Sequence, residues 1–270
     1  INKKIYNGFV NNKIVNKSFE MKLKDKLTFN ADTKTTLNKN ELRTKSNIYT
    51  SKANIFVKET KVDLKTMKIT SDYQAVIKDL SKLFDLTNTK MRGSIKIDGN
   101  FQKDENLLLT GKSNLLKGNL NYKLLNDDFT ANLENINVLK ALYMMHYPEV
   151  FDSSVNLDIK YNLATSIGIA NGLLTNGKFV KNKYSSMLDK FARFDITKEL
   201  YDKVTLESKI NKNIINSIMH FKSKYTKIDI EESVLDTLKM TTNTLIKTNI
   251  KGLKFDTRVK GDVNSPKISL

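Results

Sequence analysis

Few side chains in this 270-residue chain belong to the types that perform acid–base or nucleophilic chemistry, and their spacing assembles no catalytic site. His146 stands beside Tyr147-Pro148, where we expect a helix to end. His220 stands in a segment that we expect to be a strand. Because no motif beside either histidine supplies a nucleophile or a second base, we expect both to be structural or exposed.

Two adjacent acidic pairs, Asp127-Asp128 and Glu231-Glu232, also fail to suggest an acid and a base that act together. Neighbouring residues on a strand point to opposite faces, so the two carboxylates of such a pair do not meet. We expect Glu231-Glu232 in a turn or in the first turn of a helix, where a negative charge is favourable.

The glycines and the metal-binding residue types give no further site. Gly168, Gly172 and Gly177 are not followed by Lys-Ser/Thr, and no helix is expected to open there, so they do not form a phosphate loop. They suit hairpin turns. The chain has no cysteine, and no other metal-ligand spacing is present. We therefore predict a protein that is not an enzyme and that needs no metal or cofactor.

The dominant pattern is instead an alternation of apolar and polar residues, which is clearest from Val155 to Leu163. Side chains on a strand alternate between faces, so such a segment has one apolar and one polar face. The pattern recurs in five further segments: Phe19-Met21-Leu23, Leu27-Phe29-Ala31, Leu120-Tyr122-Leu124, Phe129-Ala131-Leu133 and, more weakly, Phe255-Thr257-Val259. A chain built mostly of half-buried strands forms a long antiparallel sheet.

Four segments depart from the alternation and predict short amphipathic helices. They are Ala75–Leu86 with Ser71 or Asp72 as the cap, Val138–Tyr147 capped by Asn137 and stopped by Pro148, Tyr184–Phe194, and Ile196–Tyr201 capped by Asp195. An apolar stripe on a helix usually meets a core, so we expect these helices to cover one end of the apolar sheet face. A membrane-touching or gating role is the alternative. The segment from Leu235 to Ile250 is ambiguous: its start fits a helical turn, and its end, Thr244–Ile250, fits a strand of poor alternation.

Composition limits the class of partner. The formal net charge is +17, but the positive charge is almost entirely lysine, with arginine only at positions 43, 92, 193 and 258. Nucleic-acid sites favour clustered arginines and stacking aromatics, which are not concentrated here, so we do not expect a nucleic-acid partner. An abundance of Lys, Asn and Ile is also what an AT-rich genome supplies. Weak attraction to anionic lipid headgroups remains open.

Length and segment composition allow one large β domain or two ordinary domains. Hydrophobic residues make up 39% of the chain, which favours a sheet with one covered face over a compact sandwich. No apolar run is long enough to span a membrane as a helix. The chain begins at Ile1, and we expect it to be a fragment or a processed form.

Several motifs follow one another in the second half of the chain. In order, they are a helix with a following proline, an alternating strand, a hairpin, a second helix and a closing strand pair: Val138–Pro148, Ser154–Leu163, Ile167–Phe179, Ser185–Phe191 and Phe255–Leu270. The closing segment contains Gly-x-Val-x-x-Pro-x-Ile-x-Leu. This order, from Asn132 to Leu270, resembles the C-terminal region of the AsmA-like family, which includes AsmA, TamB and YhdP-type proteins. The family usually has a glycine where Lys222–Ile230 has none.

The resemblance implies a fold and a function. Proteins of the AsmA-like family are anchored by an N-terminal helix in the inner membrane of Gram-negative bacteria, and their bodies project into the periplasm. Their sheet is long and folded like a taco around an apolar groove. They are implicated in phospholipid transport to the outer membrane and in outer-membrane assembly.

We therefore predict a mainly β protein, a long, strongly curved antiparallel sheet that forms a taco-like open groove with a few short amphipathic helices. Residues 1–131 are expected to form a repeated strand segment with one helix near 75–86, and residues 132–270 the AsmA-like C-terminal region. The expected partners are phospholipid acyl chains, a membrane reached through an upstream helix, and proteins of outer-membrane assembly. The candidate groove residues are Leu120, Tyr122, Leu124, Leu157, Ile159, Tyr161 and Leu163. A structural or adhesive surface β-protein without lipid transport is the alternative.

Overall fold

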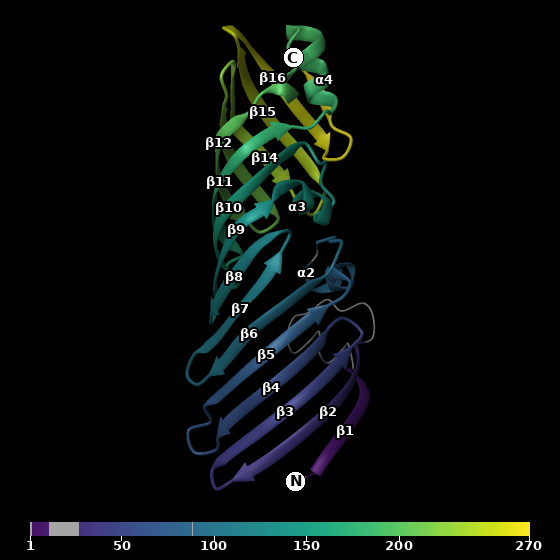
Figure 1. The fold of residues 1–270 in the computed structure, drawn as a ribbon, viewed down its shortest axis with the longest axis vertical. Coiled ribbons are helices and arrows are strands. Elements are labelled where there is room, and N and C mark those ends of the chain that lie inside the picture. The colour runs from purple at the N-terminus through teal and green to yellow at the C-terminus, as the bar shows by residue number, and fades with distance from the viewer. Residues whose placement is uncertain (1, 11–26, 88) are drawn as a thin grey trace. The chain divides into compact units, whose positions relative to one another are not determined.

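The computed structural model describes residues 2–10, 27–87 and 89–270, and shows a mainly β protein with short helices (Figure 1). Its strands are β1 (Asn2–Val10), β2 (Leu27–Asn38), β3 (Glu41–Thr50), β4 (Asn54–Asp63), β5 (Ile69–Ile77), β6 (Ile95–Lys103), β7 (Leu107–Leu115), β8 (Gly118–Leu125), β9 (Asp128–Asn137), β10 (Phe151–Asn162), β11 (Ile167–Phe179), β12 (Tyr201–Asn211), β13 (Ile214–Lys222), β14 (Thr226–Asp236), β15 (Thr241–Ile250), β16 (Leu253–Asp262) and β17 (Lys267–Ser269). The helices are η1 (Leu80–Leu83), α2 (Phe84–Thr87), α3 (Val138–Met144), α4 (Lys183–Ala192) and η2 (Ile196–Lys198).

The strands pair in one antiparallel sheet, as the alternation predicted. Each strand from β1 to β6 pairs with the next one along the chain, and so does each strand from β9 to β16. Over the described residues the sheet is neither closed nor strongly curled, so the strong curvature that the resemblance implied is wrong.

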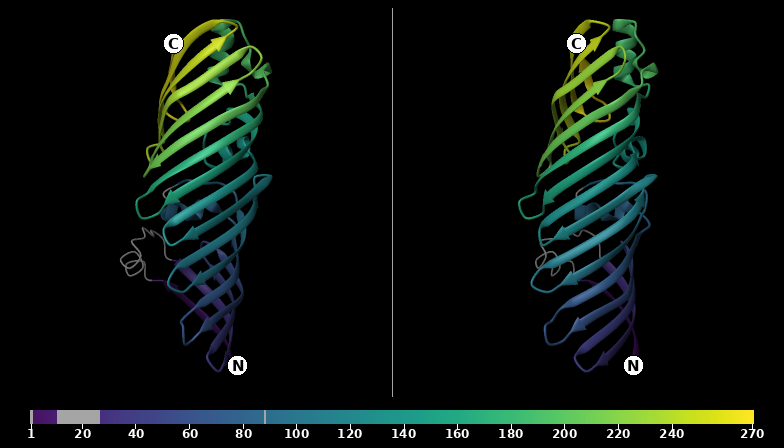
Figure 2. Two further views of the ribbon diagram at one scale, coloured as in Figure 1. Left: turned by 90° about the vertical axis from the view of Figure 1, so that its left-hand side faces the viewer. Right: turned by 60° about the vertical axis from the view of Figure 1, so that its left-hand side comes forward.

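The contacts divide the chain into two compact units. The first unit comprises residues 1–114 and 121–126, and the second comprises residues 115–120 and 127–270. The strands of the second unit from β10 to β16 lie side by side in both views of Figure 2. Each unit is described by itself below.

Alternating burial confirms the strands that the sequence predicted. Along β2, Leu27, Phe29 and Ala31 are half-buried and the residues between them are exposed. The predicted strand at Phe19, Met21 and Leu23 lies outside the described residues.

The long alternating segment behaves in the same way, except at its end. Leu157, Ile159 and Tyr161 share one face of β10. The strand ends at Asn162, however, so the prediction that Leu163 continues it is wrong. The Leu163 amide instead donates a 2.8 Å hydrogen bond to the Asp127 carbonyl in a turn.

The helices of the second unit confirm their predicted caps. The Asn137 side chain accepts a hydrogen bond from the Lys140 amide at the start of α3, and that of Asp195 accepts one from the Thr197 amide at the start of η2. Helix α4 begins with a reciprocal pair of bonds between Asn182 and Ser185. The last predicted helix is shorter than expected, because Tyr201 already begins β12.

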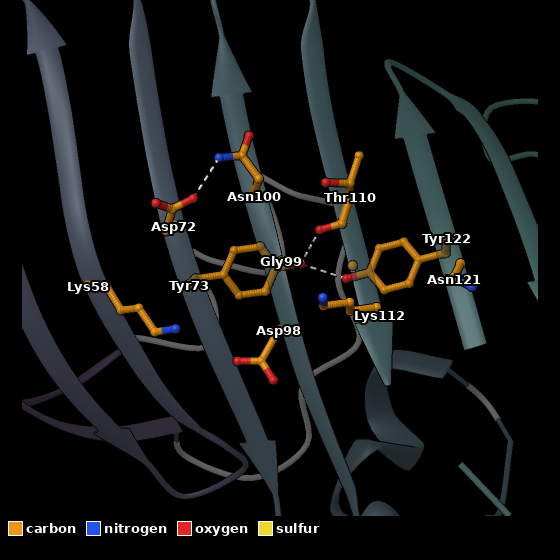
Figure 3. A pocket seen from close by; sticks show the side chains of 11 residues that line it. Lys58, Asp72, Tyr73, Asp98, Gly99, Asn100, Thr110, Lys112, Asn121 and Tyr122 are labelled. Carbon is orange, nitrogen blue, oxygen red and sulfur yellow. Dashed lines mark hydrogen bonds between the residues drawn. The ribbon is translucent and has the colours of Figure 1, made fainter. Parts of the chain in front are cut away.

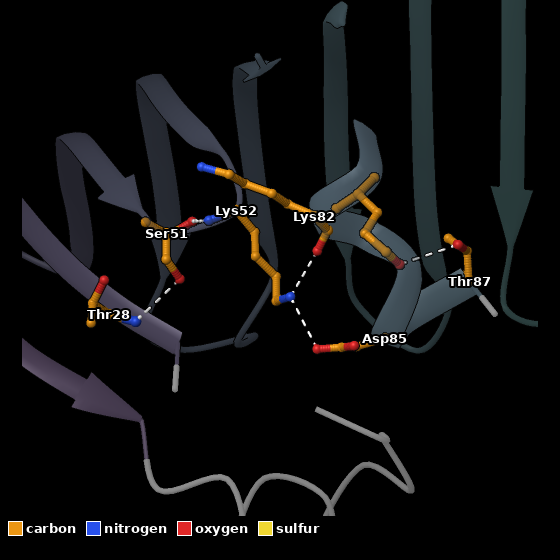
Figure 4. Close-up of polar contacts among 8 residues, drawn as sticks. Thr28, Ser51, Lys52, Lys82, Asp85 and Thr87 are labelled. Carbon is orange, nitrogen blue, oxygen red and sulfur yellow. Dashed lines mark hydrogen bonds and ion pairs between the residues drawn. The ribbon is translucent and has the colours of Figure 1, made fainter. Parts of the chain in front are cut away.

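The predicted helix at Ala75–Leu86 is wrong in its first part. Residues up to Ile77 continue β5, and the helical turns begin only at Leu80 with Asp79 as the cap. The spacing of the apolar residues there fits both a helix and a strand. Pairing with β6 stabilises the strand. An ion pair then holds these turns against the β3–β4 turn: Lys52 Nζ lies 3.3 Å from Asp85 Oδ2 and donates to the Lys82 carbonyl (Figure 4).

Two other local predictions are corrected, and one ambiguous segment is resolved. Gly168, Gly172 and Gly177 lie inside β11 rather than in hairpin turns, so Ile167–Phe179 is one strand. Glu231-Glu232 lies within β14 at a β-bulge and not in a turn or helix. The ambiguous segment is strand on both sides of a turn at 237–240.

The second unit has the larger buried core. Aromatic rings from four neighbouring strand ends meet edge to face in it, with Phe151 5.3 Å from Phe221 and Phe179 5.4 Å from Tyr201 between ring centroids. A smaller cluster of Leu188, Ile196 and Ile250 joins α4 and η2 to the strands. Among the described residues, no helix is long and apolar enough to cross a membrane.

Candidate functional site

The first unit carries an apolar cleft on one face of its sheet. The cleft has a volume of about 420 Å³, and its lining comes from β4 to β8. It is lined by Ile55, Thr60, Ile69, Ser71, Tyr73, Ala75, Ile97, Phe101, Leu109 and Tyr122. We call the face that carries these side chains the apolar face of the first unit.

Strand register explains why apolar side chains gather on this face. Residues that pair across neighbouring strands point to the same side, so they form rows that cross the strands. One such row consists of half-buried apolar residues: Ala31, Ile48, Ile55, Ala75 and Ile97. The apolar face therefore continues beyond the cleft to β2.

Two tyrosines that line the cleft lie over two glycines at one of its edges, and Figure 3 shows Tyr73, Tyr122 and Gly99. Gly99 and Gly111 pair with each other, and the rings of Tyr73 and Tyr122 lie over them. The two tyrosine hydroxyls are 2.7 Å apart, and that of Tyr73 also donates to the Thr110 carbonyl at 3.1 Å. Burial, together with the bond to Tyr122, raises the pKa of Tyr73, so its hydroxyl stays protonated at neutral pH.

Small hydroxyl residues run between the apolar rows and bond to one another. In the first unit the paired oxygens lie 3.0 Å apart in Thr33–Ser46 and 2.8 Å apart in Thr60–Ser71. A hydroxyl that already has a partner costs little to cover with apolar material, whereas an unpaired one costs much more. These pairs therefore keep the face compatible with an apolar ligand.

The second unit repeats this arrangement of rows. A hydroxyl row crosses β12 to β15, with oxygens 2.8 Å apart in Ser208–Ser217 and 2.9 Å apart in Ser233–Thr244. Apolar rows flank it on both sides: Leu157, Leu206, Met219, Ile230 and Ile246 on one, and Tyr161, Ile210, Ile215 and Leu235 on the other.

One end of the apolar face in the second unit is covered. Val138 and Ala141 of α3 and Tyr184 of α4 pack against the core formed by the strand ends. The hydroxyl of Tyr184 bonds to Thr248 at 2.8 Å, and that of the fully buried Tyr201 bonds to Thr226 at 2.7 Å. Burial raises the pKa of both tyrosines to about 12. The helices thus act here as the expected cover.

The predicted groove residues take different places. Tyr122 lines the cleft, and Leu120 and Leu124 are half-buried at alternate positions of the same strand. Leu157 packs against the covered core of the second unit.

The other three lie farther from that core. Ile159 and Tyr161 are half-buried in the rows beyond Leu157. Leu163 is 49% exposed in its turn and belongs to no row.

Sequence reasoning missed most of the cleft. Ile55, Tyr73, Ile97, Phe101 and Leu109 were not selected. The alternation Ile95-Ile97-Gly99-Phe101 was a usable signal for β6, but the glycine weakened it. Gly99 pairs directly with Tyr73 on the neighbouring strand β5, but the two residues are far apart in the sequence, so this pair has no local signature.

The prediction that His220 lies in a strand is confirmed, and charged side chains lie beside it. His220 lies on the polar face of β13 with its Nδ1 2.8 Å from Asp229 Oδ1, and its side chain is 53% exposed. Lys227 Nζ lies 2.8 Å from the other oxygen of the same carboxylate. Among the described residues, no group of three or more His, Cys, Asp or Glu side chains could hold a metal ion.

Behind the cleft, the opposite face of the same strands has a polar hollow of about 510 Å³ (Figure 3). Amide and carboxylate groups on this face bond to each other, with 2.9 Å between Asn100 and Asp72 and 2.7 Å between Gln74 and Asp98. The bond from Gln74 lowers the pKa of Asp98. This face is an ordinary solvated surface, which contrasts with the apolar one.

No family model, curated protein or solved structure matches the chain. The apolar face of the first unit is therefore the main structural indication of function.

Proposed function

We propose that the apolar face of the first unit is an open groove that holds phospholipid acyl chains, and that the protein conducts lipid in the manner of the AsmA-like proteins. One observation carries the proposal. Among the described residues of the first unit, Leu80 is the only large apolar side chain that is buried, although apolar rows cross β2 to β7. A sheet face of this composition ordinarily packs against another layer.

Acyl chains that lie on this face would cover its apolar side chains, as a second layer of protein does. Removing apolar surface from water is favourable by roughly 25 cal/mol per Å². An acyl chain that lies along the rows therefore removes both its own apolar surface and that of the sheet from water. The rows cross the strands without a charged side chain between Ala31 and Ile97. A lipid can therefore move from one strand to the next without exposing its acyl chains to water.

The wider setting forms part of the same proposal. In it the protein acts in the periplasm of a Gram-negative bacterium, held at the inner membrane by a helix outside this sequence, and delivers phospholipid or supports outer-membrane assembly. The support is the order of motifs in residues 132–270 and an apolar face without catalytic chemistry. Proteins of outer-membrane assembly would be its partners.

Native mass spectrometry of the purified chain tests the proposal directly. We expect co-purified phospholipid in the native protein. We expect Ile55→Arg to abolish it, because that side chain lies in the cleft and a buried guanidinium is costly beside acyl chains. Leu157→Arg with Ile159→Arg is less suitable, because Leu157 packs against the core of the second unit and a loss of stability would confuse the result.

The matched control is Asn47→Arg, which adds the same charge on the neighbouring strand β3. Asn47 is exposed and pairs with Phe56, so it lies on the face opposite to Ile55. We expect this variant to keep its lipid. Absence of lipid from the native protein, or equal retention in both variants, would refute the groove and favour the structural or adhesive surface protein.

A further inference from the structure

One end of the second unit combines exposed apolar side chains with an excess of positive charge. This end, which we call the helix-bearing end, consists of segments 180–200, 223–225 and 251–254. The strand register brings the three segments together, since Gly177 pairs with Tyr201, Lys222 with Lys227, and Ile250 with Leu253. Figure 1 shows α4 near one end of the second unit, close to the label of β16.

Contacts between the segments make them one surface. The Lys251 amide donates to the Tyr225 carbonyl at 2.9 Å, and the Tyr225 amide donates to Glu199 at 3.1 Å. The Lys251 ammonium lies 5.1 Å from the centre of the Tyr225 ring and 5.2 Å from that of Phe194. Lysine and aromatic side chains therefore alternate over this end.

Four large apolar side chains project from the same surface. Their exposed fractions are 49% for Phe191, 46% for Leu200, 43% for Tyr225 and 47% for Leu253. Burying such side chains requires a partner with an apolar layer close to its surface.

The charge of this end is strongly one-sided. The three segments contain eight basic residues and three acidic ones. Two of the three carboxylates are engaged locally, since Asp195 caps η2 and Glu199 binds the 223–225 turn. The turns at the other end of the same strands contain Lys212 and Lys239, and Lys239 pairs with Asp236 at 3.8 Å.

We propose that the helix-bearing end docks on an anionic lipid bilayer, with its lysines on the headgroups and Phe191, Leu200, Tyr225 and Leu253 inserted at the acyl boundary. Lysine and tyrosine are usual anchors at this depth, because each joins an apolar body to a polar tip, and phenylalanine and leucine side chains insert below them. Each basic side chain near an anionic surface strengthens binding severalfold. Nucleic acid has the negative charge that would attract the lysines, but it has no apolar layer into which the four side chains could insert.

Vesicle flotation of the full chain tests the proposal. The probes are vesicles of phosphatidylcholine alone and of phosphatidylcholine mixed with phosphatidylglycerol. We expect the native chain to float with the anionic vesicles only. Lys251→Glu with Lys254→Glu should weaken binding by roughly tenfold or more, and Leu200→Ser with Leu253→Ser should weaken it measurably at unchanged charge.

Matched controls come from the other end of the same strands. Lys209→Glu with Lys212→Glu changes the net charge equally, and Leu163→Ser with Leu238→Ser removes apolar side chains that are at least as exposed as Leu200 and Leu253. Both control variants should bind like the native chain. Equal loss in the charge control would show that the net charge of +17 acts without a site. Binding to neutral vesicles, or unchanged binding of either helix-end variant, would also overturn the proposal.

Discussion

The two units of this molecule use the same arrangement of rows on their apolar faces but cover them differently. In both, paired Ser and Thr hydroxyls run between rows of aliphatic side chains. In the second unit, α3 and α4 bury one end of the face, and side chains such as Val204 and Ile228 are almost fully buried. In the first unit, the described rows remain half-exposed. The pattern of rows is thus enough to specify a sheet. A buried core also requires helices that cover one face of that sheet.

The largest expected difference between the units comes from removing one phenylalanine from each. Phe221→Ala takes a 5% exposed ring out of the aromatic core of the second unit and should lower the free energy of unfolding by about 3–5 kcal/mol. Phe101→Ala removes a half-buried ring from the cleft and should cost about 1–2 kcal/mol, because much of that ring is already hydrated. Urea unfolding followed by circular dichroism measures both. Equal costs would mean that the face of the first unit is as well covered as that of the second.

The next difference concerns how each unit holds its helices. Those of the second unit pack through apolar contacts, whereas the short turns of the first unit combine the buried Leu80 with the ion pair between Lys52 and Asp85, whose side chains are each 9% exposed. Lys52→Met should cost about 3 kcal/mol, since it removes the positive charge beside a buried carboxylate. Hydrogen exchange of residues 80–87 should accelerate.

Two further variants identify the cause of that loss. Lys82→Met removes a charge from an exposed position of the same turns and should change stability by no more than about 0.5 kcal/mol. Lys52→Met combined with Asp85→Leu should recover most of the stability, because no uncompensated charge remains. A single Lys52→Met variant as stable as the native chain would show that packing alone holds the turns.

Local features of the fold could be predicted from the sequence, because local interactions decide them. The side chains of Asn137 and Asp195 cap helices that begin at the next residue, and Pro148 follows α3 closely. The apolar and polar residues that alternate along β10 in the sequence also alternate between more buried and exposed positions in the structure. Such features depend on residues within a few positions of one another.

The failures came from pairing between distant residues. Val76 and Ile77 fit a helical stripe, but pairing with Lys96 and Ile95 keeps them in β5. Gly168 reads as a turn residue, yet its missing side chain leaves room for the ring of Tyr161 on the neighbouring strand. The cleft depends on pairs of this kind, which is why the sequence located only Tyr122 of its lining.

The glycines offer a smaller test of the same comparison. A Cβ on Gly111 would lie 2.5 Å from the Tyr122 ring, so Gly111→Ala must displace that ring from the edge of the cleft and should cost about 1–3 kcal/mol. A Cβ on Gly172 of the second unit would lie 3.1 Å from a terminal methyl group of Leu157, which can move.

Gly172→Ala should therefore change stability by less than about 1 kcal/mol, since any crowding is offset by the lower entropy of alanine in the unfolded chain. Thermal unfolding of the two variants side by side provides the measurement. If Gly111→Ala is the more stable of the two, the tyrosine pair over the glycines is not a fixed edge of the cleft.

The smallest expected effect distinguishes a structural hydroxyl row from a ligand-binding one. Ser217→Ala leaves the Ser208 hydroxyl, in a residue only 8% exposed, without its 2.8 Å partner and should cost about 1 kcal/mol. Replacing both serines by alanine should cost less than this single change, because no buried hydroxyl is then left without a partner.

The corresponding double change in the first unit, Thr60→Val with Ser71→Ala, should also preserve the fold and leave the amount of co-purified lipid unchanged, since these hydroxyls bond to each other. Loss of lipid from that stable variant would mean that the row contacts lipid headgroups directly, and the two units would then differ in chemistry as well as in cover.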